Sequence, residues 1–282
     1  MKLISYRHGG AEKYGVVSGD GVVDMSARLG DRYPTLRDAI AGLALDEMAR
    51  QAGGASADLA LPDIEFMHPI TTPEKILCVG RNYRAYHEVV ADGAMKHPSI
   101  FPRFPSSFAA HNGAILKPRV SDTLDYEGEL VAIIGRSGRH IPEDRAMDHV
   151  IGYTIMNEGS VREWQRFGAQ NCPGKNFYQS GSIGPWMVTA DELPDLSKVP
   201  IQTRVNGEIR QDGATDMMIF SLPYVIAHVS KFTWLEPGDM IATGSPGGSA
   251  VEEDPPRWLK PGDTIEIEIP PIGVLKNTIE AE

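Results

Sequence analysis

Short strand-forming segments separated by proline and glycine dominate the chain from residue 74 onward. Candidate strands lie at Ile76–Val79, Glu129–Ile134, Val150–Met156, Trp186–Thr189, Ile201–Val205, Met240–Thr243 and Thr264–Ile269. One helix is predicted among them, over Leu222–Phe232. Because long helices do not alternate with the strands, the pattern excludes a βα Rossmann array and predicts a strand-rich α+β body.

The first 65 residues predict a small module of their own. Lys2–Tyr6 and Tyr14–Val17 alternate as strands do, and Gly19-Asp20-Gly21 is a hairpin signal. Thr35–Ala52 carries apolar residues at near-helical spacing. We therefore predict two domains, over residues 1–65 and 66–282.

The composition argues against some classes of binding partner for this protein. The 38 acidic and 27 basic residues give a net charge of −11, and no basic cluster stands out, so nucleic-acid binding is not expected. No apolar run approaches the ~20 residues of a membrane span, and the N-terminus has no signal core. Cys78 and Cys172 have no metal-ligand spacing and suggest no disulfide framework. We expect a cytoplasmic protein that binds neither nucleic acid nor membrane.

Two glutamates at the start of an apolar segment form the first candidate site. Glu127, Gly128 and Glu129 lead directly into the run Leu130–Gly135. Because strand side chains alternate faces, the two glutamates should point the same way. A hard divalent cation such as Mg²⁺ takes oxygen ligands of this kind. The alternative is a solvated strand face, since such short motifs often match by chance.

Two further segments supply an acid and cations. Glu158 lies two residues after the strand pattern that ends at Met156, where the chain leaves the strand, and Arg162 follows it. Catalytic groups often collect where the chain leaves a strand. Lys175 lies in the turn-rich, otherwise uncharged stretch Pro173–Phe177. Together with the first pair of glutamates, these residues could form one charged site; an ordinary surface lysine is the alternative for Lys175.

With these segments in view, the chain resembles the fumarylacetoacetate hydrolase family over roughly residues 74 to 280. The matching motifs, in family order, are Val79–Tyr83, Asp125–Leu130, Gly152–Asn157 with an acid next, Gly174–Phe177, Gly184–Trp186, Val205–Glu208, Leu235–Asp239, Thr243–Pro246 and Leu259–Asp263. Each motif alone is weak evidence, but the whole series in one order is strong evidence.

The resemblance implies a mixed β-roll body with a small N-terminal α+β domain, a Mg²⁺ or Mn²⁺ site and a homodimer. It also implies a small oxo acid as the substrate, as in the catabolism of aromatic compounds. The implied activities are C–C bond hydrolysis of acylpyruvates and other diketo acids, decarboxylation of oxaloacetate-like 2-oxo acids, and isomerisation of enol diacids such as 2-hydroxyhepta-2,4-diene-1,7-dioate.

The resemblance also assigns roles to individual positions. Glu127, Glu129 and Glu158 match the three metal-ligand positions, and Lys175 matches the active-site lysine. The positions that match substrate-contacting or site-lining residues are Arg81, Tyr83, Arg103, Arg162, Gln165 and Thr243.

Three positions depart from the family pattern. Glu158 stands where aspartate is usual, and Arg103 stands where a lysine is common. Tyr86 occupies the position of a histidine that normally pairs with a glutamate, and His87 and Glu88 follow it. His87 with Glu88 is our candidate base pair, because histidine titrates near neutral pH. A surface histidine is the alternative interpretation.

Three functions stay open at this point. The leading hypothesis is a metal-dependent hydrolase that cleaves a C–C bond in a short acylpyruvate or other diketo acid through a stabilised enolate. The second is a decarboxylase or isomerase that uses the same site without an attacking water. The third is a metal- and ligand-binding protein without catalysis, because a fold alone does not fix a function.

Overall fold

The structure is a computed structural model of the chain, and it describes residues 1–84 and 96–282. Its strands are β1 (Lys2–His8), β2 (Ala11–Ser18), β3 (Gly21–Asp24), β4 (Leu59–Ala60), β5 (Glu65–Phe66), β6 (Ile76–Gly80), β7 (Ser99–Arg103), β8 (Phe108–Ala110), β9 (Ala114–Lys117), β10 (Leu124–Asp125), β11 (Gly128–Ile134), β12 (Val150–Asn157), β13 (Ser160–Val161), β14 (Gly181–Thr189), β15 (Pro200–Val205), β16 (Glu208–Ala214), β17 (Met240–Ala242), β18 (Thr264–Ile269) and β19 (Gly273–Ala281). Its α-helices are α1 (Ser26–Leu29), α2 (Leu36–Ala41), α3 (Leu45–Ala52), α4 (Cys172–Lys175) and α5 (Leu222–Val229). Short 3₁₀ turns connect several of these elements.

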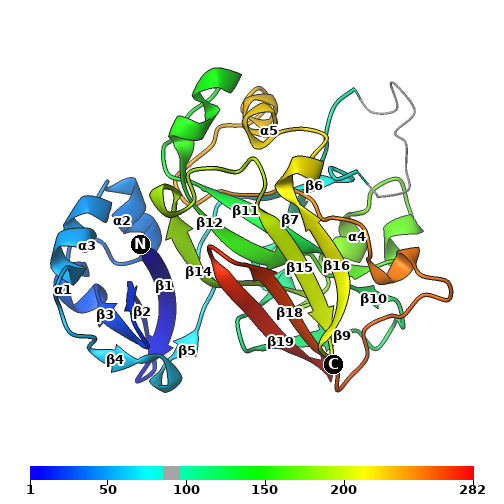
Figure 1. The fold of residues 1–282 in the computed structure, drawn as a ribbon, viewed down its shortest axis with the longest axis horizontal. Coiled ribbons are helices and arrows are strands. Elements are labelled where there is room, and N and C mark those ends of the chain that lie inside the picture. The colour runs from blue at the N-terminus through cyan, green and yellow to red at the C-terminus, as the bar shows by residue number, and fades with distance from the viewer. Residues whose placement is uncertain (85–95) are drawn as a thin grey trace.

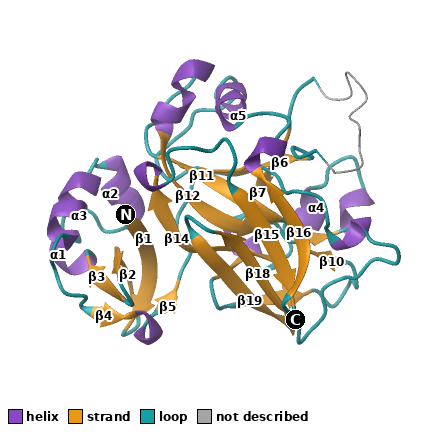
Figure 2. Ribbon diagram, viewed as in Figure 1, coloured by secondary structure: helices purple, strands orange, loops and turns teal. Residues whose placement is uncertain are grey.

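Most of the described strands join in one large mixed sheet (Figures 1 and 2). Its order is β4-β3-β2-β1-β14-β12-β11-β17-β6-β7, with β5 on β1 and β8 on β14. A second sheet has the order β16-β15-β18-β19-β9, and β10 pairs with β13. Parallel pairs join β17 to β6, β14 to β8 and β19 to β9, among otherwise antiparallel neighbours. This architecture confirms the predicted strand-rich α+β fold.

Strand β11 lies inside the large sheet, between β12 and β17, and it is buried on both faces. Leu130, Ala132 and Ile134 pack into one hydrophobic cluster, whereas Val131 and Ile133 pack into another on the opposite face. A strand covered on both faces needs apolar residues at every position, which explains the unbroken apolar run. The chain therefore carries its paired glutamates into the interior.

The N-terminal strands β1 to β5 and helices α1 to α3 lie to one side, at the left of Figure 1. The hairpin predicted at Gly19-Asp20 is confirmed, since Ser18 pairs with Gly21. Strand β1 also pairs with β14 of the main body, so one sheet runs through both parts. The predicted domain boundary at residue 65 therefore lies within a continuous sheet and stays a prediction.

Each predicted strand corresponds to an observed one, but the predicted helices differ in length. The expected helix over 35–52 is two helices, α2 and α3, because Leu43 has the left-handed backbone angle φ = 56°. Helix α5 ends at Val229, three residues before the predicted end at Phe232. Within the described ranges, every helix is too short or too polar to cross a membrane.

Candidate metal centre and active site

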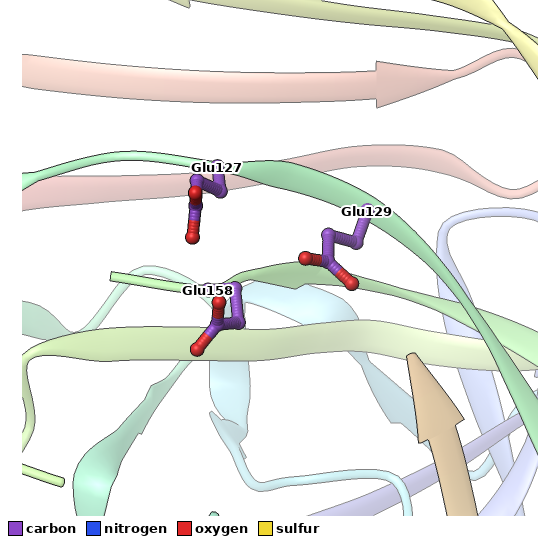
Figure 3. Close-up of side chains that lie close together, drawn as sticks. All are labelled: Glu127, Glu129 and Glu158. Atoms are coloured by element: carbon purple, nitrogen blue, oxygen red, sulfur yellow. The ribbon is translucent and has the colours of Figure 1, made fainter. Parts of the chain in front are cut away.

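Three glutamates from two neighbouring strands meet at one place (Figure 3). Glu127 directly precedes β11, Glu129 lies within it, and Glu158 directly follows β12. One carboxylate oxygen from each residue lies within 4.8 Å of the other two. Pairing of Gly128 with Asn157 brings the two strand ends together. The backbone N–H of Glu158 donates to the carbonyl of Glu127 at 2.8 Å. The predicted acidic cluster is therefore present.

The cluster fits a hard divalent cation in ligand type and in size. All three side chains offer carboxylate oxygens, which Mg²⁺ and Mn²⁺ prefer. Because one oxygen of each glutamate lies within 4.8 Å of the other two, a single cation could contact all three residues. Glu129 is buried and accepts a hydrogen bond from the backbone N–H of Gly244 at 2.8 Å. Burial, with repulsion from Glu158 and Glu127, raises the pKa of Glu129 well above its usual range. A cation beside Glu129 would stabilise its ionised form.

Lys175, at the end of α4, lies against two of the three glutamates. Its Nζ donates to Glu127 Oε2 at 2.5 Å, to Glu158 Oε2 and to Ser160 Oγ at 2.8 Å. The ammonium group also lies 5.2 Å from the centre of the Phe101 ring. Burial acts to lower the pKa of Lys175, but Glu127 and Glu158 outweigh it and raise that pKa. The two glutamates therefore favour the charged form of the lysine inside the site.

Arg162 joins the cluster to a second buried acid. Its Nε donates to Asp125 Oδ2 at 2.6 Å, and its Nη2 donates to Glu127 Oε1 at 2.9 Å. Its Nη1 donates to Gln165 Oε1 at 3.3 Å. Asp125 also accepts the backbone N–H of Ala250 at 2.8 Å. Arg162 and Gln165 therefore line the cluster on the side of Glu127.

The three glutamates differ in how strongly their ionised forms are stabilised. Burial acts to raise the pKa of Glu127, but Arg162 and Lys175 outweigh it and hold that pKa well below its usual range. For Glu158, burial dominates despite the charge of Lys175, so its pKa is raised. The negative charge that lacks full compensation thus lies at Glu129 and Glu158, where a divalent cation would stabilise the cluster most.

Arg103, at the end of β7, lies wholly inside the protein, with a side chain that is 0% exposed. Its Nη1 donates to Glu158 Oε1 at 3.0 Å and to the carbonyl of Gly159 at 2.8 Å. Its Nε donates to Ser107 Oγ at 3.2 Å, and its Nη2 donates to Ser180 Oγ at 3.3 Å. The predicted substrate-binding arginine thus contacts a glutamate of the cluster.

The remaining predicted residues lie on the side of Glu129 or outside the described chain. The Tyr83 hydroxyl lies 3.2 Å from Thr243 Oγ1, and both residues are buried. Thr243 directly precedes the glycine whose N–H binds Glu129. Arg81 is exposed just after β6 and has φ = 57°. His87 and Glu88 lie outside the described residues.

Sequence reasoning missed three polar residues that hold the site. Asp125 anchors Arg162, as described above. Asn157 Oδ1 accepts the backbone N–H of Glu127 at 3.1 Å, and Ser160 Oγ donates to Glu127 Oε2 at 3.1 Å. The spacing of Glu158 and Ser160, two residues apart in extended chain, was the available signal for Ser160.

These features define a class of protein: a mixed-β protein with a buried three-carboxylate site and a lysine against it. A family model described as "Fumarylacetoacetate (FAA) hydrolase C-terminal" matches residues 75–280. The chain therefore belongs to the fumarylacetoacetate hydrolase family, as its motifs predicted.

Solved structures similar to this chain include enzymes of two reaction types. A fumarylacetoacetate hydrolase from psychrophilic Exiguobacterium antarcticum has a TM-score of 0.85 and 32% identity, with 100% of both chains covered. Maleylpyruvate hydrolase from Sphingobium sp. SYK-6, in complex with manganese(II) ion and pyruvate, has a TM-score of 0.84 and 26% identity. That match covers 100% of this chain and 99% of the other. 5-Carboxymethyl-2-hydroxymuconate delta-isomerase from Mycobacterium smegmatis has a TM-score of 0.79 and 27% identity, with the same coverage.

Proposed function

We propose that this protein is a divalent-metal-dependent hydrolase that cleaves a C–C bond in a short acylpyruvate or other diketo acid. The observation that carries the proposal is the buried meeting of Glu127, Glu129 and Glu158 with Lys175. The three glutamates would hold Mg²⁺ or Mn²⁺, which supplies Lewis-acid polarisation of a carbonyl oxygen.

Lys175 has the position and charge to stabilise the leaving group. When water adds to a carbonyl of a 1,3-dicarbonyl acid, the C–C bond breaks and its electron pair passes to the leaving fragment as an enolate. The enolate oxygen needs a positive charge beside it. The three N–H donors of the buried Lys175 bind Glu127, Glu158 and Ser160, so Lys175 would turn a donor to the enolate when the two carboxylates bind the cation instead. Removing one such stabilising group from other enzymes lowers the rate about 10²–10³-fold.

Other residues of the chain would orient the reactants. Arg162 holds Glu127 in place, and Gln165 and Thr243 are proposed to contact the substrate. Arg81 and Tyr83 are proposed to contact it from the segment that follows β6. His87 with Glu88 stays our proposed base for the attacking water. We also propose a homodimer, which sedimentation analysis would test.

The named neighbours support both the leading function and one alternative. The Sphingobium maleylpyruvate hydrolase, solved with manganese(II) ion and pyruvate, supports a metal and an oxo acid at this site. The Mycobacterium smegmatis delta-isomerase favours a second candidate, an isomerase or decarboxylase on the same site. Tyr86 at the usual histidine position points the same way, because enolate stabilisation without water activation would suffice for those reactions.

The decisive experiment identifies products formed in ¹⁸O-labelled water. Purified protein with Mg²⁺ or Mn²⁺ would be mixed with a panel of acylpyruvates, oxaloacetate and an enol diacid, and products would be analysed by mass spectrometry. Hydrolysis yields pyruvate and a second acid that carries one ¹⁸O atom from the solvent. Release of CO₂ would identify a decarboxylase, and a rearranged product of unchanged mass would identify an isomerase.

Two controls connect the activity to the site. Lys175→Met should lower kcat at least about 10²-fold, whereas Lys198→Met removes an exposed lysine and should leave kcat unchanged. A chelator should abolish turnover, and added Mn²⁺ should restore it. Full turnover by metal-stripped protein would refute the proposal. Ligand binding without any product would instead identify a binding protein.

A further inference from the structure

We propose that Arg103 is a positioning residue that fixes Glu158 for metal binding and makes no contact with the substrate. The inference rests on the proposed function for the role of Glu158, and it replaces the substrate-binding role that the sequence suggested for Arg103. The hydrogen bonds of the Arg103 guanidinium group support this role.

Every N–H donor of Arg103 has an acceptor inside the protein. A guanidinium group has five N–H donors and no acceptor. The acceptors are Glu158 Oε1, the carbonyls of Gly159 and Ser107, and the hydroxyls of Ser107 and Ser180, at 2.8 to 3.4 Å. A substrate carboxylate could bind only by displacing one of these buried partners.

The surroundings of Arg103 hold the guanidinium plane in one orientation. The group lies over the Phe108 ring, 4.3 Å from its centre. The backbone of Arg103 is fixed by pairing with Ile76 of β6. Ser107, which accepts two of the five hydrogen bonds, also donates to the carbonyl of Phe104 at 2.7 Å. The chain from Arg103 to Phe108 therefore folds around its own arginine.

This fixed group divides the two oxygens of Glu158 between two partners. Oε1 accepts from Arg103, and Oε2 accepts from Lys175 beside the other carboxylates. A glutamate has one more rotatable bond than an aspartate, so an unrestrained Glu158 would lose more conformational entropy on binding a metal. The planar fork of an arginine is pre-organised and always charged, which suits it to this restraint.

A positioning role and a substrate-binding role predict different effects of Arg103→Lys. Lysine keeps the charge but lacks the fork, so Glu158 should be less well oriented. Loss of a partner behind a metal ligand typically costs 10–100-fold in metal affinity. We therefore expect the Kd for Mn²⁺ to rise about 10–100-fold, with KM for the substrate unchanged at saturating Mn²⁺.

Titration of the metal-free proteins with Mn²⁺, by calorimetry and electron paramagnetic resonance, tests this without substrate. Arg204→Lys is the matched control, because Arg204 also binds acidic side chains, and these residues, Glu266 and Glu268, are not part of the acidic cluster. Its Kd for Mn²⁺ should not change. Thermal unfolding would confirm that each variant is folded.

A double-mutant cycle separates positioning from a general loss of packing. Glu158→Asp draws the carboxylate back by one methylene, away from the fork. If Arg103 acts through Glu158, adding Arg103→Lys to Glu158→Asp should cost little further Mn²⁺ affinity. Additive losses would overturn the inference, and so would an unchanged Mn²⁺ affinity in Arg103→Lys with a raised KM. Failure of the unmodified protein to bind Mn²⁺ would overturn the proposed function as well.

Discussion

At the scale of a single residue, Glu129 differs from Glu127 and Glu158 in its hydrogen-bond donor. Its carboxylate accepts from the backbone N–H of Gly244, which carries no net positive charge. Glu127 binds two cationic side chains and Glu158 binds two. Burial disfavours the ionised form of Glu129, and only the backbone N–H of Gly244 counteracts that effect by a hydrogen bond among the described residues. In the absence of a metal, ionisation of Glu129 therefore lowers the stability of the folded protein.

Glu129→Gln should stabilise the metal-free protein while it removes activity. The neutral amide can still accept the N–H of Gly244, and it removes repulsion from the other carboxylates. We expect the free energy of unfolding, measured in urea with a chelator, to rise by about 1–2 kcal/mol. Turnover should fall at least about 10²-fold. The exposed residue Glu280 gives the control variant Glu280→Gln. A destabilised Glu129→Gln protein would contradict the prediction.

His111 should make stability depend on pH. Burial lowers its pKa to about 4, and the backbone N–H of Lys276 donates to its Nδ1 at 3.1 Å, which requires that nitrogen to be unprotonated. Below about pH 6.5 the unfolded state takes up the proton and the folded state does not. The contribution of His111 is thus fully present above about pH 6.5 and is lost as the pH falls toward 4.

The expected loss is on the order of 2–3 kcal/mol. His111→Asn keeps an acceptor for Lys276 but cannot titrate, so urea unfolding of this variant should depend less on pH over this range. His140→Asn, at an exposed position, is the control. Equal pH dependence in His111→Asn and the unmodified protein would show that His111 does not contribute.

At the scale of elements, strands with an unbroken apolar run could be predicted from the sequence. Strands that combine apolar residues with proline, charged or buried polar residues could not. The apolar run of β11 was predictable because both of its faces are covered. Strand β7 was missed because it contains Pro102 and Arg103, and β19 was missed because the buried Asn277 interrupts its alternation. Both strands pair with the strand that directly precedes them in the chain, β6 and β18, and β19 also pairs with the distant β9.

In the site, too, some features could be predicted from the sequence and others could not. The three clustered glutamates and Lys175 lie in local motifs and could be singled out from the sequence. The contact of Arg162 with Asp125, and of Arg103 with Glu158, joins segments more than 30 residues apart, and no local pattern specifies it. The partners of a buried charge depend on strand order, which becomes fixed only when the sheets assemble.

Gly128 gives a prediction about how β11 sits against the second sheet. A Cβ atom at this position would lie 2.4 Å from Thr203 Oγ1 and 3.1 Å from Ile267 Cγ2. Gly128→Ala should therefore push β11 away from β15 and β18 and displace the glutamates on either side of it. We expect a loss of about 1–3 kcal/mol in the free energy of unfolding and weaker Mn²⁺ binding.

Gly80→Ala is the matched control for this variant. A Cβ atom at Gly80 would meet its nearest neighbour, Phe101, at 3.4 Å, which is an ordinary contact. Its urea unfolding curve and Mn²⁺ titration should match those of the unmodified protein. If Gly128→Ala behaved like Gly80→Ala, the close packing of β11 on the second sheet would be contradicted.

At the scale of the whole molecule, one hydrophobic core crosses the predicted domain boundary. Leu3, Met25 and Ile40 belong to the same cluster as Val131 and Ile133 of β11. The N-terminal ammonium group also donates to Thr189 Oγ1 at 2.6 Å and to Glu192 Oε1 at 3.0 Å in the main body. Both features connect the first 65 residues to the rest of the chain.

A protein that consists of residues 66–282 alone should therefore not fold stably. Its β14 edge would lose the strand that pairs at Lys2 and Leu3, and part of the core would be exposed. We expect aggregation or a non-cooperative thermal transition, measured by light scattering and circular dichroism. A soluble, cooperatively folded fragment that binds Mn²⁺ would instead support an independent domain.

Gly128 of β11 pairs with Asn157 of β12, so the acidic cluster forms only when these two strands are in their native register. A slip of one residue between β11 and β12 would turn Glu129 toward the opposite face and separate it from Glu158. A folding intermediate with unpaired or shifted strands would not bring the three glutamates together. The rate at which the refolding protein gains Mn²⁺ binding should therefore report the rate at which β11 and β12 reach their native register.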